Sequence, residues 1–255
     1  SHMSTASHGA EREMGHTGNF FNLLWALPSV ALSGPNASGA WMAEYGWYFD
    51  LARRWDGTFR HQGPPQERED SYGNWNSTGP YLLAYAQFLR KIHLTGKKQG
   101  VVDQIDREKA ATLIEDGNGW SPRFKDEPFP GQSEDFLIEA LRSWSPIVRE
   151  RAAIALSNRD RAPISKLISM LGEGELQARL GACQALALQK GKAERAIRPL
   201  RLTLEAEDLW LRIKAAEALA AMGSEAMPAV PDLLQLLANR DPERDPRGMQ
   251  QRYLC

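Results

Sequence analysis

Three copies of one eight-residue helical pattern constrain the fold of the second half of the chain. Each copy starts with arginine, has small residues at its fourth and fifth positions and ends in Ala-Leu. The copies occupy 149–156, 179–186 and 212–219, so they recur after 30 and then 33 residues. Helical repeats of this length stack into a solenoid, in which each hairpin buries its apolar face against its neighbours.

A second helical segment with leucines in register follows each copy. These leucines are Leu167 and Leu171, Leu200 and Leu204, and Leu233 and Leu237. The small residues let neighbouring helices approach, and the leucines fill the space between layers. We therefore predict three hairpins over 134–238, with Leu200 and Leu233 buried, and a tail over 239–255 that is either mobile or a cap.

The first arginine of each copy is predicted to be structural. Glu175 precedes Arg179 by four residues, and Asp208 precedes Arg212 by four. An acid one turn before an arginine at a helix start favours an ion pair between them. In the first copy, Ser145 is expected to cap the helix instead.

The second helix of each hairpin is expected to line a concave surface that binds a partner. These helices carry Lys166, Arg198 and Arg201 but few acids that are expected to be exposed. The predicted ligand is therefore a mildly acidic protein segment. The alternative is that these cations form a solvated face.

The first half, over 15–130, has a different composition. It holds most of the aromatic residues, and all five histidines lie at or before His93. Apolar helices are predicted over 16–32, 37–54 and 80–94, with a short one over 104–116. The first and third are apolar nearly all round, whereas the second has one polar face. An order of buried, half-exposed and buried helices is typical of an α/α toroid, and four-helix packing is the alternative.

Two details of these helices follow from residue type and spacing. Asn36 is predicted to cap the helix over 37–54. The inward face of this helix is expected to carry Ala40, Trp41, Tyr48 and Leu51.

The loop at 55–65 is the candidate site of the first half. If successive helices run antiparallel, the loop and the starts of the first and third helices meet at one mouth. His16, Asp56 and His61 are then candidates for proton exchange, and Trp55, Asp70, Trp75 and Asn76 are candidates for ligand binding, for example of a sugar ring. The alternative is that Asp56 caps a turn, Gly57 has a positive φ and the tryptophans belong to the core.

Two resemblances carry further expectations. The Arg-x-x-Ala/Gly-Ala/Cys-x-Ala-Leu pattern with its leucines resembles HEAT-like repeats of the phycobilisome-lyase type. The segment 15–21 and the turn Asp56–Phe59 resemble part of a terpenoid-cyclase/prenyltransferase-like toroid. The whole chain resembles an uncharacterised bacterial family that joins such a segment to HEAT-like repeats, which implies export to the periplasm or beyond.

Charge and cysteine content narrow the function classes. The 31 basic and 32 acidic residues nearly cancel, so nucleic acid is not an expected partner. The two cysteines and the histidines show no metal-ligand spacing, no cofactor motif occurs, and no apolar run suggests a membrane span. We therefore predict an all-α chain, with partial α/α-toroid-like hairpins followed by a HEAT-like α-solenoid. Its predicted function is protein binding or scaffolding; the alternative is part of an enzyme that acts on a glycan or similar polyhydroxylated substrate.

Overall fold

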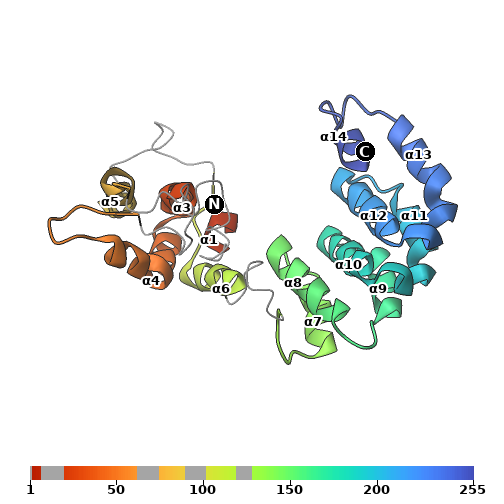
Figure 1. Ribbon diagram of the computed structural model, residues 1–255, viewed down its shortest axis with the longest axis horizontal. Helices are drawn as coiled ribbons and strands as arrows, with labels where there is room; N and C mark the ends of the chain where they lie inside the picture. The colour runs from red at the N-terminus through yellow and green to blue at the C-terminus, as the bar shows by residue number, and fades with distance from the viewer. Residues whose placement is uncertain (1, 7–19, 62–74, 90–101, 119–127) are drawn as a thin grey trace. The chain divides into compact units, whose positions relative to one another are not determined.

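The computed structural model describes residues 2–6, 20–61, 75–89, 102–118 and 128–255 (Figure 1). Its regular structure is helical in these ranges, which confirms the predicted all-α class. The chain forms two compact units, Ser1–Asp126 and Glu127–Cys255. No helix in the described ranges is long and apolar enough to cross a membrane.

The first unit is built from short and medium helices around an aromatic core. They are α1 (His2–Ala6), α3 (Phe20–Ala31), α4 (Pro35–Ala52), α5 (Thr78–Ala86) with a 3-10 turn over Gln87–Leu89, and α6 (Arg107–Gly117). α4 packs against α3 and α6, and α5 packs against α3. Trp41, Phe49 and Tyr81 are fully buried between them.

Several predicted details of the first unit are wrong. Gly34, with a φ of 98°, precedes α4 as its N-cap, and the Asn36 side chain instead donates to the Ile105 carbonyl. Leu51 was expected to face inward, yet it is exposed, and so is Trp25 on the helix that was expected to be buried on most sides. Neither α3 nor α4 is therefore covered all round, and a toroid-like arrangement stays a prediction.

The second unit is a row of helical hairpins. Its helices are α7 (Glu134–Ala140), α8 (Pro146–Ser157), α9 (Ile164–Leu171), α10 (Leu176–Gln189), α11 (Ile197–Thr203), α12 (Leu209–Ala221), α13 (Val230–Ala238) and α14 (Met249–Leu254). The hairpins join α8 with α9, α10 with α11 and α12 with α13, while α7 precedes and α14 follows them. 3-10 segments precede α11 and α13, at Lys190–Ala196 and Gly223–Ala229. The repeated pattern lies in α8, α10 and α12, and α10 packs against both of the others.

In Figure 1 the helices of this unit form two rows along an arc. Helices α8, α10 and α12 follow the inner edge, whereas α9, α11 and α13 follow the outer edge. The expectation that Lys166, Arg198 and Arg201 sit on a concave face is therefore wrong, because their helices belong to the outer row.

The leucine register predicted from the repeats holds, except at the end of the array. Leu167 and Leu200 are fully buried, and Leu171 and Leu204 nearly so. Leu233 packs against the same core but is only partly buried, in the last of the helices α9, α11 and α13 that the structure describes.

The repeated arginines are structural, but their partners differ from the prediction. Arg149 donates to the Ser143 and Trp144 carbonyls, at 2.6 and 3.0 Å. Arg179 donates to the Leu171 carbonyl at 2.9 Å. Arg149 thus binds carbonyls of the connection between α7 and α8, whereas Arg179 binds the carbonyl of the last residue of α9, which would otherwise lack an intrahelical donor. Burial lowers the pKa of Arg149, although at neutral pH the guanidinium stays charged.

Candidate functional site

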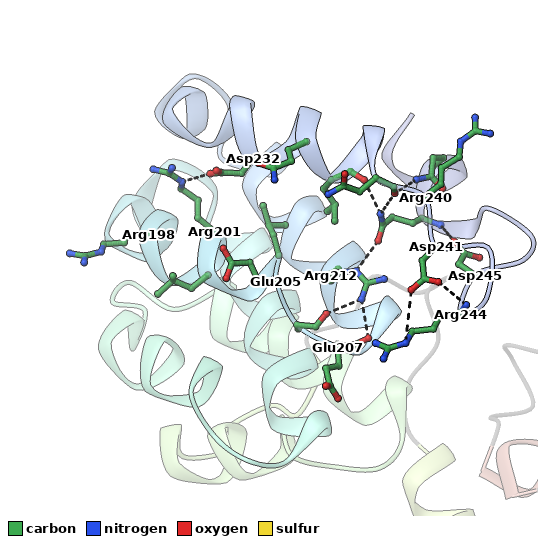
Figure 2. Close-up of a pocket in the computed structure, with 18 residues that line it drawn as sticks. Arg198, Arg201, Glu205, Glu207, Arg212, Asp232, Arg240, Asp241, Arg244 and Asp245 are labelled. Carbon is green, nitrogen blue, oxygen red and sulfur yellow. Dashed lines mark hydrogen bonds and ion pairs between the residues drawn. The ribbon is translucent and has the colours of Figure 1, made fainter.

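A pocket of about 670 Å³ lies within the second unit, between the last two hairpins and the tail (Figure 2). Its walls come from α11, α12, α13, α14 and the two connections that follow α11 and α13. Ten charged side chains line it: Arg198, Arg201, Arg212, Arg240, Arg244, Glu205, Glu207, Asp232, Asp241 and Asp245. The pocket is therefore lined by charges of both signs, with equal numbers of arginines and acids.

Three of the arginines are held by groups inside the pocket. Arg201 pairs with Asp232 at 2.5 Å, and Arg244 lies 3.9 Å from Asp241. Arg212, the arginine of the third repeat, donates to the Ala206 and Glu207 carbonyls at 2.8 and 2.9 Å. These contacts fix the walls and leave the three guanidinium groups less available to a ligand.

The tail forms one wall of the pocket and caps the last hairpin. The Gln250 amide donates to the Leu236 carbonyl at 2.8 Å and accepts from Arg212 Nε at 2.8 Å. The Asp245 carboxylate accepts from the backbone N–H groups of Met249 and Gln250, at 2.8 Å each. These two bonds lower the pKa of Asp245 and anchor the start of α14. Of the two predicted states of the tail, the structure thus shows the cap.

Four charged side chains at the edge of the pocket make no ion pair with any described residue. They are Arg198, Arg240, Glu205 and Glu207, and all four are exposed. Arg198 lies at one end of the pocket, with its guanidinium directed outward (Figure 2). Leu202 adds an exposed apolar side chain to the same rim.

The structure brings two of the three predicted partner-binding residues together and separates the third. Arg198 and Arg201 line the same pocket. Lys166 lines a smaller pocket of about 390 Å³ and pairs with Glu134 and Asp135, at 2.7 and 2.8 Å. Few exposed acids were expected on the second helices themselves, and the two acids at the rim of this pocket, Glu205 and Glu207, lie on the connection after α11.

In the first unit, Asp56 organises a tight turn. Its Oδ1 accepts from the Thr58 backbone N–H at 3.0 Å and from the Thr58 hydroxyl at 2.7 Å. The hydroxyl bond is the main cause of a lowered pKa for the Asp56 carboxyl. Gly57 has a φ of 81°, which glycine adopts without strain. The turn geometry therefore accounts for both residues without a ligand.

His61 is buried beside two tyrosines. Its Nδ1 lies 2.9 Å from the Tyr81 hydroxyl and 3.4 Å from the Tyr48 hydroxyl. Burial lowers the pKa of His61 to about 4 and raises that of Tyr81. The imidazole is consequently neutral at pH 7, and its Nδ1 can accept a hydrogen bond from Tyr81. This cluster ties the loop to α4 and α5.

The other candidates of the first half lie around this loop or outside the described residues. Trp55 is 96% exposed, so it belongs to no core, and Trp75 is exposed as well. The Trp75 carbonyl accepts from the His61 backbone N–H at 2.9 Å, and Asn76 Oδ1 accepts from the Thr78 N–H at 3.1 Å, where α5 begins. His16 and Asp70 are outside the described residues. An acid/base or sugar-binding site here stays a prediction.

No group of three or more histidine, cysteine, aspartate or glutamate side chains in the described part of the chain is arranged to hold a metal ion. Cys183 is fully buried in α10, and burial raises the pKa of its thiol to about 12. It therefore stays a protonated core residue at neutral pH.

Comparisons with known proteins agree with this division of the chain. Residues 164–249 match a family model described as HEAT repeats, and residues 1–96 match one described as a domain of unknown function, DUF6288. The HEAT match begins at the first residue of α9 and includes most of the pocket's lining residues. The second half is thus a helical-repeat scaffold.

Curated proteins gave no match to the chain. Among solved structures, the crystal structure of an engineered protein aligns with 99% of this chain and 96% of its own, at 17% identity and a TM-score of 0.32. A TM-score of this size says nothing about a shared fold.

Proposed function

We propose that the chain is a protein-binding module and that the pocket beside α14 holds a segment of its partner. The observation that carries this proposal is the set of four rim charges that make no ion pair with a described residue, two arginines and two glutamates, around a pocket of about 670 Å³. Extended surfaces built from stacked hairpins commonly serve as binding faces.

The chemistry of the rim describes the ligand. Arg198 and Arg240 favour carboxylates, whereas Glu205 and Glu207 favour lysine or arginine side chains. The exposed Leu202 adds a small apolar contact. A polypeptide segment with charges of both signs around an apolar residue fits this rim better than a uniformly acidic one. This revises the mildly acidic ligand expected from sequence.

Reversing the charge of the rim arginines should weaken binding. The variant is Arg198→Glu with Arg240→Glu, which leaves the Arg201–Asp232 pair between hairpins intact. Recovery of the partner from a native extract is expected to fall about tenfold, since rim charges act through attraction that salt screens. The reverse pair, Glu205→Lys with Glu207→Lys, is expected to reduce recovery as well.

The matched control reverses two exposed cations that line neither described pocket, Arg161→Glu with Lys190→Glu. It changes net charge by the same amount and should leave recovery unchanged. Equal losses in control and rim variants, with circular dichroism unchanged, would show that net charge alone matters. That result would remove the pocket as the binding site.

A further inference from the structure

The first helix of each repeat carries an arginine at its fourth position, and so does α14. The repeat arginines are Arg149, Arg179 and Arg212, and the corresponding residue of α14 is Arg252. α14 also packs against α12, as α12 packs against α10. It therefore lies beside α12 as the first helix of a following hairpin would.

The contacts of α14 nevertheless differ from those of the repeats. Arg252 is exposed, and its side chain makes no hydrogen bond or ion pair with a described residue. Two glutamines bind the carbonyls at the end of α13 instead. Gln250 donates to the Leu236 carbonyl at 2.8 Å. Gln251 donates to the Leu237 carbonyl at 3.2 Å. Glutamine thus has the role at the end of α13 that arginine has at the end of α9.

Glutamine can also do what arginine cannot, because its amide accepts a hydrogen bond as well as donating. Gln250 uses both capacities. Its nitrogen donates to the Leu236 and Asn239 carbonyls, at 2.8 and 3.2 Å, and its oxygen accepts from Arg212 Nε at 2.8 Å. The Gln251 amide adds a bond to the Asn239 carbonyl at 2.8 Å. Gln250 is only 6% exposed, so losing these bonds would leave buried polar groups unpaired.

The bonds of Gln250 join the two connections that carry rim charges. Its partner Arg212 also donates to the Glu207 carbonyl at 2.9 Å, on the connection after α11 (Figure 2). Its other partner, Asn239, directly precedes Arg240 on the connection after α13. One buried side chain therefore links the backbone of Glu207 with the backbone next to Arg240.

We infer that Gln250 is the positioning residue of the pocket, which holds the rim charges of Glu207 and Arg240 at the spacing that a partner segment meets. The role in binding rests on the function proposed above, whereas the role in positioning does not. Charges that are already in place when a ligand arrives need no ordering on binding. Loosening the connections should therefore weaken binding although every rim charge remains.

Distances between spin labels test the positioning without a partner. The labels are attached to Glu207→Cys and Arg240→Cys in a Cys255→Ser background, because Cys255 is exposed. Double electron–electron resonance should then give one narrow distance distribution. Gln250→Leu should broaden this distribution at least about twofold, because the two connections lose their shared anchor. An unchanged distribution would overturn the inference.

Gln177→Leu is the matched control for this measurement. Gln177 is the second residue of α10, as Gln250 is of α14, but it is exposed. Its replacement should leave the distribution narrow. Equal broadening in the two variants would mean that the array loosens as a whole, and it would remove the special role of Gln250.

Gln250→Glu separates the two halves of the amide. A carboxylate still accepts from Arg212 but does not donate to the Leu236 and Asn239 carbonyls. Hydrogen exchange should therefore become faster in peptides that cover 239–245 and stay at the wild-type rate in those that cover 205–208. In Gln250→Leu both sets should exchange faster. Faster exchange of both sets in Gln250→Glu would show that the docking of α14 as a whole holds the connections, against the inference.

Recovery of the protein that the wild type retains from a native extract tests the role in binding. Gln250→Leu should reduce this recovery about tenfold. If the variant with Arg198→Glu and Arg240→Glu loses recovery but Gln250→Leu does not, the proposed function stands and the positioning role in binding falls. If neither variant loses recovery, the pocket fails as the binding site, and the spin-label distances alone decide whether Gln250 positions the rim.

Discussion

Replacing Gly181 with alanine is expected to destabilise the second unit by about 3 kcal/mol, because the new methyl group has nowhere to go. A Cβ at this position would lie 2.2 Å from the Leu141 carbonyl oxygen and 3.0 Å from the Leu141 Cβ. The obstacle is backbone, which cannot rotate aside. The end of α7 and helix α10 would have to move apart, and the packing between them would loosen.

Gly39→Ala is the matched control for this substitution. Gly39 also lies inside a helix, α4, and a Cβ there would meet nothing within 4 Å. Because alanine favours the helix, the free energy of unfolding of the first unit should rise by about 0.5–1 kcal/mol in this variant. The stability of both variants can be measured by urea unfolding, with hydrogen exchange of peptides from each unit as the readout. A Gly181→Ala variant as stable as the wild type would contradict the close approach.

Leu200→Ala is expected to lower the free energy of unfolding by about 2–5 kcal/mol, the range for deleting a large apolar side chain from a packed core. Leu200 is fully buried in α11, within the continuous core of the hairpins. The cost includes the lost burial and the cavity that remains, because the stacked helices can relax only in part.

Leu202→Ala is the control for this second substitution. Leu202 lies in the same helix, two residues on, and is 64% exposed. Its replacement should change the free energy of unfolding by less than about 0.5 kcal/mol. Similar urea midpoints for the two variants would mean that the helix is rotated relative to the register described here.

The fold of the second half could be predicted from sequence because repetition supplies independent evidence for one register. Three copies place leucines at equivalent positions, and the core follows from them. The partners of the arginines could not be predicted. At a helix start, an acid can cap its own helix instead of pairing: Asp208 accepts from the Leu211 N–H at 2.8 Å, so Arg212 binds carbonyls.

The first half was less predictable because its apolar helices lack a repeat that fixes their orientation. Periodicity shows that α3 and α4 are apolar, but not which apolar side chains are covered. For this reason the exposure of Trp25 and Leu51 could not be predicted from the sequence. The loop residues show a related limit. Residue types alone left both a site and a turn open at Asp56, and its hydrogen bonds belong to the turn.

The pocket could be found only in part. Arg198 and Arg201 could be predicted as candidates because both are cations on one predicted helix. Arg240 and Glu207 come from the connections after α13 and α11, which are far apart in sequence and line one pocket in the structure. The signal available in sequence was in the tail, where the acid Asp245 comes shortly before residues 249–254, since acids favour the starts of helices.

Site-specific photo-crosslinking tests the protein-binding proposal most directly. A benzophenone amino acid is placed at Leu202, on the rim of the pocket, and in a second variant at Leu188, which is exposed on α10 and lines neither described pocket. We expect a covalent adduct to one protein from the Leu202 variant, and its loss when Arg198 and Arg240 are changed to glutamate. Adducts from Leu188 but not from Leu202 would contradict the proposal and place the binding surface elsewhere.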